Sequence, residues 1–287
     1  MEPATTRRAA QEAKSLAVSL GLEVDNGAVL NDSNRVVVRL LPCDVVARIS
    51  PIGWFGAARE VEVARRLAAE TDAPIAGLDV RVDPVSFRRG GFDISLWTHV
   101  EAEPSSSIPP EEYSAVLQHL HEAMRQIDDV AAPHCTERLQ EAVHWITDHE
   151  LTPDLRSEDR ELLVQCLEPS KGLLLSGAGS QGQLLHGEPH PWNVLNAERG
   201  PVFVDFENCA RGPIEYDLGW VPQAVSGRYP GVDPELVEEC RGIVLALVAA
   251  HRWRRDDQHP SGRQSGIAFL DHVRTGPPWP ALDYVSW

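Results

Sequence analysis

No two of the five cysteines lie close together, which argues against a disulfide framework and against a CxxC metal site. Long apolar runs are also missing: the most apolar later stretch, Ile243–Ala250, is too short to cross a bilayer, and Met1–Leu22 is an amphipathic pattern rather than a signal peptide. Positive charge is scarce, because the formal net charge is −17, and an acidic surface repels phosphate backbones. We therefore expect a cytoplasmic protein with reduced cysteines that binds neither nucleic acid nor membrane.

The first third of the chain has the pattern of a small antiparallel sheet with two helices. Apolar residues at helical spacing predict helices over about Thr6–Leu20 and Ala57–Ala69. The proline-, serine- and acid-rich segment Glu101–Glu112 then indicates a linker. Strands are predicted from β-branched runs bounded by turn formers, at Ala28–Asn31, Arg35–Leu41, Asp44–Ile49, Pro84–Arg88 and Phe92–Val100.

The rest of the chain is mostly helical in pattern. Two short apolar runs, Gln183–His186 and Pro201–Phe206, predict a short hairpin, and Asp233 is expected to cap a helix. This order of elements predicts an α+β fold, with a sheet lobe in residues 1–100, a helical lobe in residues 101–287 and a ligand site between them. Helices are expected at Pro110–Asp128, Thr136–Thr147, Ser157–Leu167, Ile214–Ala224, Pro234–Arg255 and Ser261–Arg274.

The residues best suited to chemistry lie in two short segments, LLHGEPHPWNVL at 184–195 and VFVDFEN at 202–208. Phosphoryl transfer needs a carboxylate to orient the acceptor hydroxyl, a cation to bridge the phosphates, and a positive group to hold the donor. Glu188 can orient a hydroxyl, and Asn193 and Asp205 are hard oxygen ligands suited to Mg²⁺.

These segments resemble the aminoglycoside phosphotransferase and choline kinase-like family, relatives of the protein kinases. That family carries H-G-D-x-H-x-x-N, then an apolar strand ending in Asp; the chain has HGEPHPWN at 186–193, VFVD at 202–205 and a later YDL at 216–218. The resemblance implies a bilobal protein-kinase-like fold. It also implies transfer of the γ-phosphoryl group of ATP or GTP, with Mg²⁺, to a hydroxyl of a small molecule such as an aminoglycoside or related antibiotic, an amino sugar or an amino alcohol.

The resemblance implies a role for each matching residue. Glu188 would be the catalytic base or hydroxyl-orienting acid, His186 would stabilise its loop, and Asn193 and Asp205 would bind Mg²⁺. Asp217 would brace the same region through backbone hydrogen bonds. Nucleotide binding would fall to Arg48, in place of the family's lysine, to its ion-pair partner Glu60, to Asn34 in the turn before the second strand, and to the hinge Trp97, Thr98, His99 and Val100.

Two departures keep an alternative open. Glu188 stands where the family has Asp, and Arg48 stands where it has Lys; both changes alter reach or bulk, so an inactive nucleotide- or ligand-binding relative is the second hypothesis. A zinc site at His186 and His190 is disfavoured, because no P-C-x-x-C follows and the intervening prolines prevent a regular helix. Trp192 is expected either in the acceptor pocket or in the core. The sequence predicts neither the acceptor nor the oligomeric state.

Overall fold

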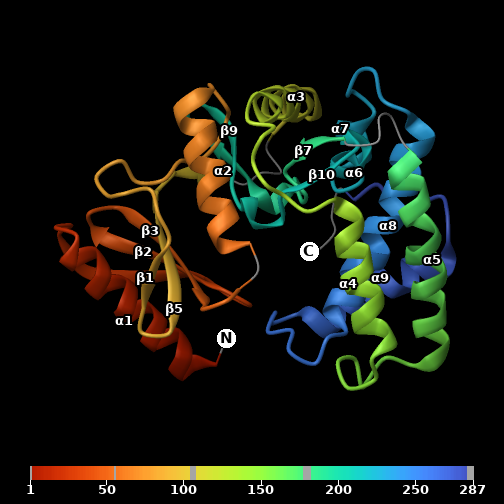
Figure 1. Ribbon diagram of the computed structural model, residues 1–287, viewed down its shortest axis with the longest axis horizontal. Helices are drawn as coiled ribbons and strands as arrows, with labels where there is room; N and C mark the ends of the chain where they lie inside the picture. The colour runs from red at the N-terminus through yellow and green to blue at the C-terminus, as the bar shows by residue number, and fades with distance from the viewer. Residues whose placement is uncertain (1, 55, 104–107, 177–181, 283–287) are drawn as a thin grey trace.

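The computed structural model describes residues 2–54, 56–103, 108–176 and 182–282. It has two lobes, with the sheet lobe on the left of Figure 1 and the helical lobe on the right. This arrangement confirms the expected α+β, kinase-like architecture. The first lobe contains α1 (Pro3–Ser19), β1 (Val24–Asp32), β2 (Val36–Pro42), β3 (Val45–Pro51), α2 (Ala57–Glu70), β4 (Phe87–Arg89) and β5 (Phe92–Thr98).

The sheet of this lobe has five strands in the order β1-β2-β3-β5-β4, and all neighbours are antiparallel. Along β3, Val45, Ala47 and Ile49 are buried in the core formed with α1. Because successive side chains of a strand point to opposite faces, Arg48 lies on the other face, where it meets α2. The alternation of β3 therefore sets the position of this arginine.

The second lobe packs its helices around two apolar cores, one of which includes the long and fully apolar middle of α8. Asp233 caps that helix by accepting hydrogen bonds from the backbone of Glu235 and Leu236, as predicted. The lobe contains β6 (Ala102–Glu103), α3 (Pro110–Gln126), α4 (Cys135–Thr147), α5 (Ser157–Ser176), β7 (Gln183–Leu185), η2 (Pro191–Asn193), β8 (Val194–Ala197), β9 (Gly200–Phe203), η3 (Phe206–Asn208), β10 (Ala210–Gly212), α6 (Ile214–Leu218), α7 (Gln223–Ser226), α8 (Pro234–Arg252) and α9 (Gly262–Thr275).

The expected linker is more ordered than its composition suggests. Ala102 and Glu103 form β6, which pairs with β8 of the second lobe. Residues 104–107 of the linker lie outside the described part of the chain. The predicted division between residues 100 and 101 stays a prediction.

Two of the predicted helices have wrong bounds. α5 continues past Pro169 to Ser176, because Leu167 and Leu174 both remain packed in the core. The predicted helix over residues 214–224 is divided into α6 and α7, since Pro222 cannot donate a helical hydrogen bond.

The two apolar runs of the second lobe do not pair with each other, so the simple hairpin expected between them is wrong. β7 pairs with β10, whereas β9 pairs with β8. This pairing brings the segment after β7 and the segment after β9 to the same region of the lobe. Those two segments carry the predicted site.

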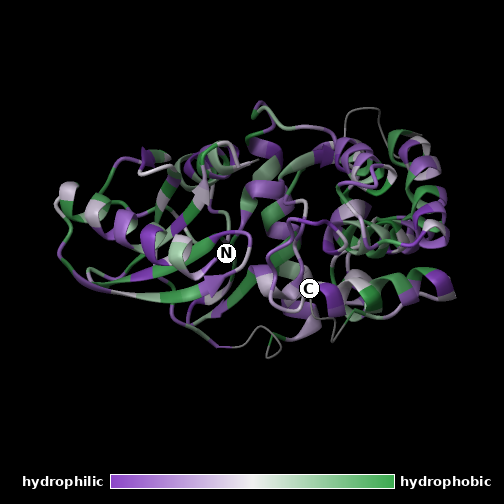
Figure 2. Ribbon diagram, turned by 90° about the horizontal axis from the view of Figure 1, so that it is seen from below, coloured by the Kyte–Doolittle hydropathy of each residue, from purple (hydrophilic) through white to green (hydrophobic). Residues whose placement is uncertain are grey.

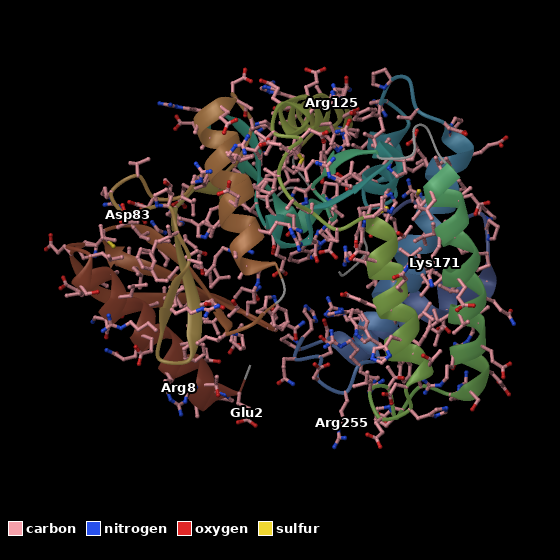
Figure 3. All side chains as sticks on the ribbon, viewed as in Figure 1. Glu2, Arg8, Asp83, Arg125, Lys171 and Arg255 are labelled. Carbon is pink, nitrogen blue, oxygen red and sulfur yellow. The ribbon has the colours of Figure 1, made fainter. Side chains whose placement is uncertain are left out.

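Apolar side chains gather in the buried cores of both lobes. Figure 2 shows hydrophilic turns along the outer helices and apolar segments along the strands. In Figure 3, Glu2, Arg8 and Arg255 lie along the lower edge of the molecule. All five cysteines are free thiols. In the described ranges, no helix has both the length and the apolar composition needed to cross a membrane.

Candidate active site

The predicted catalytic loop begins directly after β7 and is fixed by a glycine. Gly187 has a φ of +90°, and a Cβ added there would lie 2.0 Å from the carbonyl oxygen of Asn208. Because a side chain would be strained by this φ and would also collide with that backbone, only glycine fits without a shift. The loop therefore packs directly on η3, the turn that follows Asp205.

His186 is fully buried and joins the same two segments. Its Nε2 donates to the carbonyl oxygen of Val204 at 3.0 Å, and its Nδ1 accepts from the backbone of Glu188 at 3.3 Å. Burial lowers its pKa, so the imidazole is neutral near pH 7. A buried, neutral histidine bonded only to backbone has the geometry of a loop-positioning residue.

Asp217 holds the start of the loop through hydrogen bonds to its backbone. Its two carboxylate oxygens accept the backbone N–H groups of His186 and Gly187, each at 2.9 Å. His121 of α3 adds a contact from Nε2 to the same carboxylate at 3.0 Å. These bonds match the backbone-bracing role that the family resemblance implied for Asp217.

Glu188, the expected catalytic carboxylate, is paired with a residue that the sequence analysis missed. Arg138 of α4 donates from Nη2 to Glu188 Oε1 at 2.5 Å and from Nη1 to the carbonyl of Gly187 at 3.3 Å. Its guanidinium also lies over the ring of Trp220, 5.5 Å from the ring centre. Burial opposes the charge of Arg138, but Glu188, together with Tyr216 and Glu207, raises the arginine's pKa. Each of the two side chains is 19% exposed.

The two expected metal ligands come from adjacent backbone. Val204 donates to the carbonyl of Asn193 at 3.0 Å, so the residue before Asp205 is bonded to Asn193 itself. The side-chain amide nitrogen of Asn193, Nδ2, donates to the backbone carbonyl of Glu188 at 3.0 Å. This leaves the amide oxygen, a hard ligand, as the atom suited to a metal. Asp205 has a φ of +72°, a left-handed backbone that Asp tolerates better than most residues.

Asp205 also lies within a cluster of five charged side chains that come from both lobes. Arg48 Nη2 is 3.0 Å from Glu60 Oε1 and 2.8 Å from Asp205 Oδ1, so the expected Arg48–Glu60 ion pair is present. Arg35, the residue before β2, contacts Asp205, Glu60 and Glu207. The structure thus brings Arg48, Glu60 and Asp205 together and adds two residues that were not predicted, Arg35 and Glu207.

The side chains of this cluster shift one another's pKa values. Burial disfavours the charge of Asp205, but Arg35 and Arg48 outweigh burial and lower its pKa. Burial raises the pKa of Glu60, and it raises the pKa of Glu207 to about 7 despite the nearby arginines. The cluster therefore holds Asp205 as a carboxylate and leaves Glu207 close to its titration near neutral pH.

The hinge residues expected to bind the nucleotide are Trp97, Thr98, His99 and Val100. Trp97 is buried against α2, with the guanidinium of Arg48 5.8 Å from its ring centre. The backbone N–H of Thr98 donates to the carbonyl of Gly77, and His99 lies 3.5 Å from Asp44. Val100 follows the end of β5 and is half-buried.

Asn34 is adjacent to the charge cluster in sequence, but its side chain turns away from it. Its Oδ1 accepts from the backbone of Gln258 at 2.9 Å, and its Nδ2 donates to Asp257 at 3.3 Å. The turn before β2 is thus bonded to the segment between α8 and α9. Trp192 is 70% exposed, which rules out the core position considered for it.

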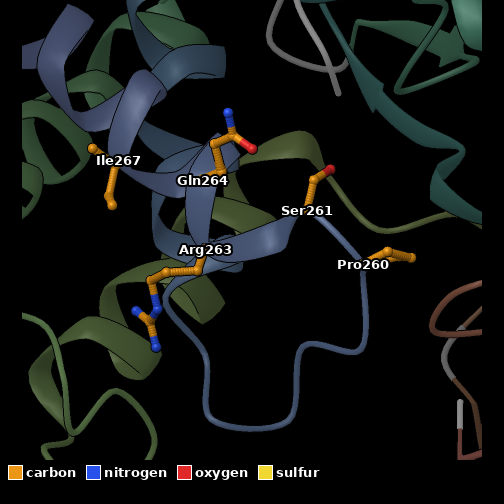
Figure 4. Close-up of a pocket in the computed structure, with 5 residues that line it drawn as sticks. All are labelled: Pro260, Ser261, Arg263, Gln264 and Ile267. Carbon is orange, nitrogen blue, oxygen red and sulfur yellow. The ribbon is translucent and has the colours of Figure 1, made fainter.

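A surface pocket of about 460 Å³ lies at the start of α9, apart from the predicted site residues. Figure 4 shows Arg263 and Gln264 pointing to different sides of this helix. The pocket is lined by Pro260, Ser261, Arg263, Gln264 and Ile267.

Residues 21–242 match the model of the phosphotransferase enzyme family, which is more than half of the chain. The chain belongs to this family. No curated protein sequence matches it significantly.

Several solved structures share its fold at low identity. An amicoumacin kinase in complex with AMP-PNP, Ca²⁺ and Ami has 11% identity and a TM-score of 0.70, with 98% of each chain covered. The choline kinase from Streptococcus pneumoniae has 12% identity and a TM-score of 0.66, covering 91% of this chain and 96% of that one. The GDP complex of aminoglycoside 2′-phosphotransferase-IIIa has 13% identity and a TM-score of 0.65, covering 91% and 98%.

Proposed function

We propose that this phosphotransferase moves the γ-phosphoryl group of ATP or GTP to a hydroxyl of a small molecule. The observation that carries the proposal is the contact between the two loops: Asn193 is bonded to the backbone of both Glu188 and Val204, directly beside Asp205. A hydroxyl-orienting carboxylate and two hard oxygen ligands thus lie on one connected piece of backbone. Complexes of related folds with AMP-PNP, ADP and GDP support a nucleotide donor.

The residues present fit a magnesium–nucleotide complex. Asp205 is an ionised carboxylate that lies beside two guanidinium groups, so its surroundings already hold positive charge. Over the described ranges, no group of three His, Cys, Asp or Glu side chains is arranged to hold a metal by itself. This suits Mg²⁺, which is usually bound by one or two protein ligands together with phosphate oxygens and water. When bound, Mg²⁺ supplies charge neutralisation for the transferring phosphoryl group.

The side chains of the chain would share the chemistry as follows. Within the described residues, Nε of Arg48 has no hydrogen-bond acceptor, so this buried guanidinium has a donor left for the donor phosphates. Glu188 would accept the proton of the acceptor hydroxyl while the acceptor oxygen bonds to the γ-phosphorus and the bond to the leaving nucleoside diphosphate breaks. His186 and Asp217 would hold the loop in place.

A second candidate function is nucleotide or ligand binding without transfer. The contact that favours it is the Glu188–Arg138 pair, because a carboxylate engaged at 2.5 Å must release or share Arg138 before it can orient a hydroxyl. Both candidates require nucleotide binding, and only the first requires a phosphorylated product.

A phosphorylation screen separates them. The purified protein is incubated with Mg²⁺ and ATP or GTP against aminoglycosides, amino sugars and amino alcohols, and product is detected by mass spectrometry. We expect turnover that is lost on chelation of the metal and in Glu188→Ala and Asp205→Ala. Glu198→Ala, which removes an exposed carboxylate in the neighbouring β8–β9 turn, is the matched control and retains turnover.

Retained turnover in a folded Asp205→Ala variant would refute the metal role. Tight nucleotide binding with no product from any acceptor in the panel would favour the binding protein.

A further inference from the structure

Arg35 is the most heavily engaged cation of the charge cluster. Its Nη2 donates to both oxygens of Asp205 at 2.7 Å, and its Nη1 lies 2.8 Å from Glu207 and 3.2 Å from Glu60. The Arg35 side chain is only 10% exposed, and its three partners come from both lobes. Arg35 therefore covers the carboxylate that the proposed function assigns to the metal.

Asp205 cannot keep this contact and bind a divalent cation at the same time. A Mg²⁺ ligand lies about 2.0–2.1 Å from the metal, and both carboxylate oxygens already face the same guanidinium nitrogen. A metal placed there would also stand against two positive side chains, because Arg48 shares Oδ1 of Asp205 at 2.8 Å. Arrival of the metal must displace at least Arg35 from Asp205.

Displacement from Asp205 leaves Nη1 of Arg35 on Glu207 and Glu60 but takes both acceptors from Nη2, and a buried charged donor without an acceptor is costly. The phosphates that accompany the metal are the anions that would arrive with it, and a guanidinium binds them in bidentate fashion. The segment Asn31–Asn34, which ends β1 and enters the turn before β2, contains no glycine, whereas phosphate-binding loops commonly use glycine so that backbone N–H groups can approach the ligand. A side-chain cation at the end of this turn would supply donors that the backbone does not.

We propose that Arg35 is a second phosphate-binding arginine beside Arg48, and that it occupies Asp205 until a metal–nucleotide complex displaces it. The inference rests on the proposed function for the metal role of Asp205. It gives Arg35 opposite effects on two ligands: it opposes binding of the metal alone and favours binding of the metal together with a nucleoside triphosphate.

The test measures both effects on the full chain. Mn²⁺ alone is titrated by electron paramagnetic resonance, and a non-hydrolysable ATP analogue is titrated by calorimetry with Mn²⁺ present. In Arg35→Met, we expect Mn²⁺ alone to bind at least tenfold more tightly and the analogue with Mn²⁺ at least tenfold more weakly than in the wild type. Substitution of a residue that only supports the fold would weaken both ligands together.

Two controls locate the effect. Arg39→Met makes the same chemical change four residues further along, within β2, where Arg39 pairs with Asp44, and it leaves both affinities unchanged. Arg35→Met combined with Asp205→Asn loses the gain in Mn²⁺ affinity, because the gain depends on the exposed carboxylate. If Arg35→Met does not fold, Arg35→Lys keeps the charge but loses the two-point contact, and it shifts both affinities in the same directions by a smaller factor.

Unchanged or weaker Mn²⁺ binding in the folded Arg35 variants would overturn the inference, as would a gain that persists without Asp205. These titrations use no acceptor, so they test the role of Arg35 even if the wild type transfers no phosphoryl group. Transfer by the wild type with no opposite shift in the two affinities overturns only the role of Arg35. A wild-type protein that binds no nucleotide overturns both proposals.

Discussion

Gly187 offers the sharpest test of how the catalytic loop is held. Its α-carbon touches the backbone of η3, and an added Cβ would lie 2.0 Å from the carbonyl oxygen of Asn208. We predict that Gly187→Ala loses both stability and activity. The loss has two physical parts, the strain of the left-handed backbone and the collision between the two loops.

The two parts can be sized separately. A non-glycine residue at a left-handed φ costs about 1–2 kcal/mol. Real Cβ contacts are almost never shorter than 3.0 Å, so the 2.0 Å approach forces one loop to move by about 1 Å; overpacking of this kind costs a further ~1–3 kcal/mol. A shift of about 1 Å between Glu188 and Asp205 also lowers a transfer rate by roughly a hundredfold.

Gly91 supplies the matched control. Its φ of +88° nearly equals the +90° of Gly187, but nothing lies within 4 Å of a Cβ added there. Urea unfolding of the two alanine variants therefore isolates the collision, and we expect Gly187→Ala to be less stable than Gly91→Ala by about 1–3 kcal/mol. Equal stabilities, or full turnover in Gly187→Ala, would show that the loops are not locked together as described.

Two further substitutions address the pairs around the site. Arg138→Met removes the partner of Glu188, so kcat should fall roughly a hundredfold with little change in the KM for nucleotide. Arg138→Lys should restore part of the lost kcat. An increase in kcat, measured by steady-state kinetics, would mean that Arg138 restrains Glu188 instead. Burial and nearby arginines lower the pKa of His251 to about 3, so the folded state resists its protonation and loses stability as pH falls below 6.5. Between pH 7 and pH 5, the free energy of unfolding of His251→Gln should fall by about 1 kcal/mol less than that of the wild type. This value is reduced for solvent screening, because the side chain is 32% exposed. Equal losses for the two proteins in urea titrations would contradict the prediction.

The sheet lobe was predictable because its signals are local. The alternation of β3 between apolar core residues and Arg48 follows from strand geometry alone, and the turn formers around it fix the strand ends. Errors occurred where tertiary packing decided the outcome. α5 passes Pro169 because its apolar residues are packed on both sides of the proline, and β6 forms only because β8 lies beside it.

The two loops of the proposed site could be picked out for the same reason, since HGEPHPWN and VFVD are compact patterns. Arg35 was missed because nothing in its neighbourhood marks it: its partner Asp205 lies 170 positions away in sequence. Glu207 stands within the quoted VFVDFEN segment, yet only the fold reveals that its carboxylate faces Arg35. The loops could be picked out because their residues are close together in the sequence. The arginine that pairs with Asp205 and Glu207 comes from a distant element and could not.

The glutamate at position 188 is best understood together with Arg138. Arg138 is fixed by three contacts, to Glu188, to the carbonyl of Gly187 and to the face of Trp220, so it cannot follow a shorter side chain easily. An aspartate on the same backbone would end about 1.5 Å earlier, which turns the 2.5 Å contact into a separation of about 4 Å, beyond hydrogen-bonding range. The extra methylene thus allows the carboxylate to reach α4. Glu in place of Asp is therefore one half of a paired feature, in which the longer carboxylate and the arginine on α4 depend on each other.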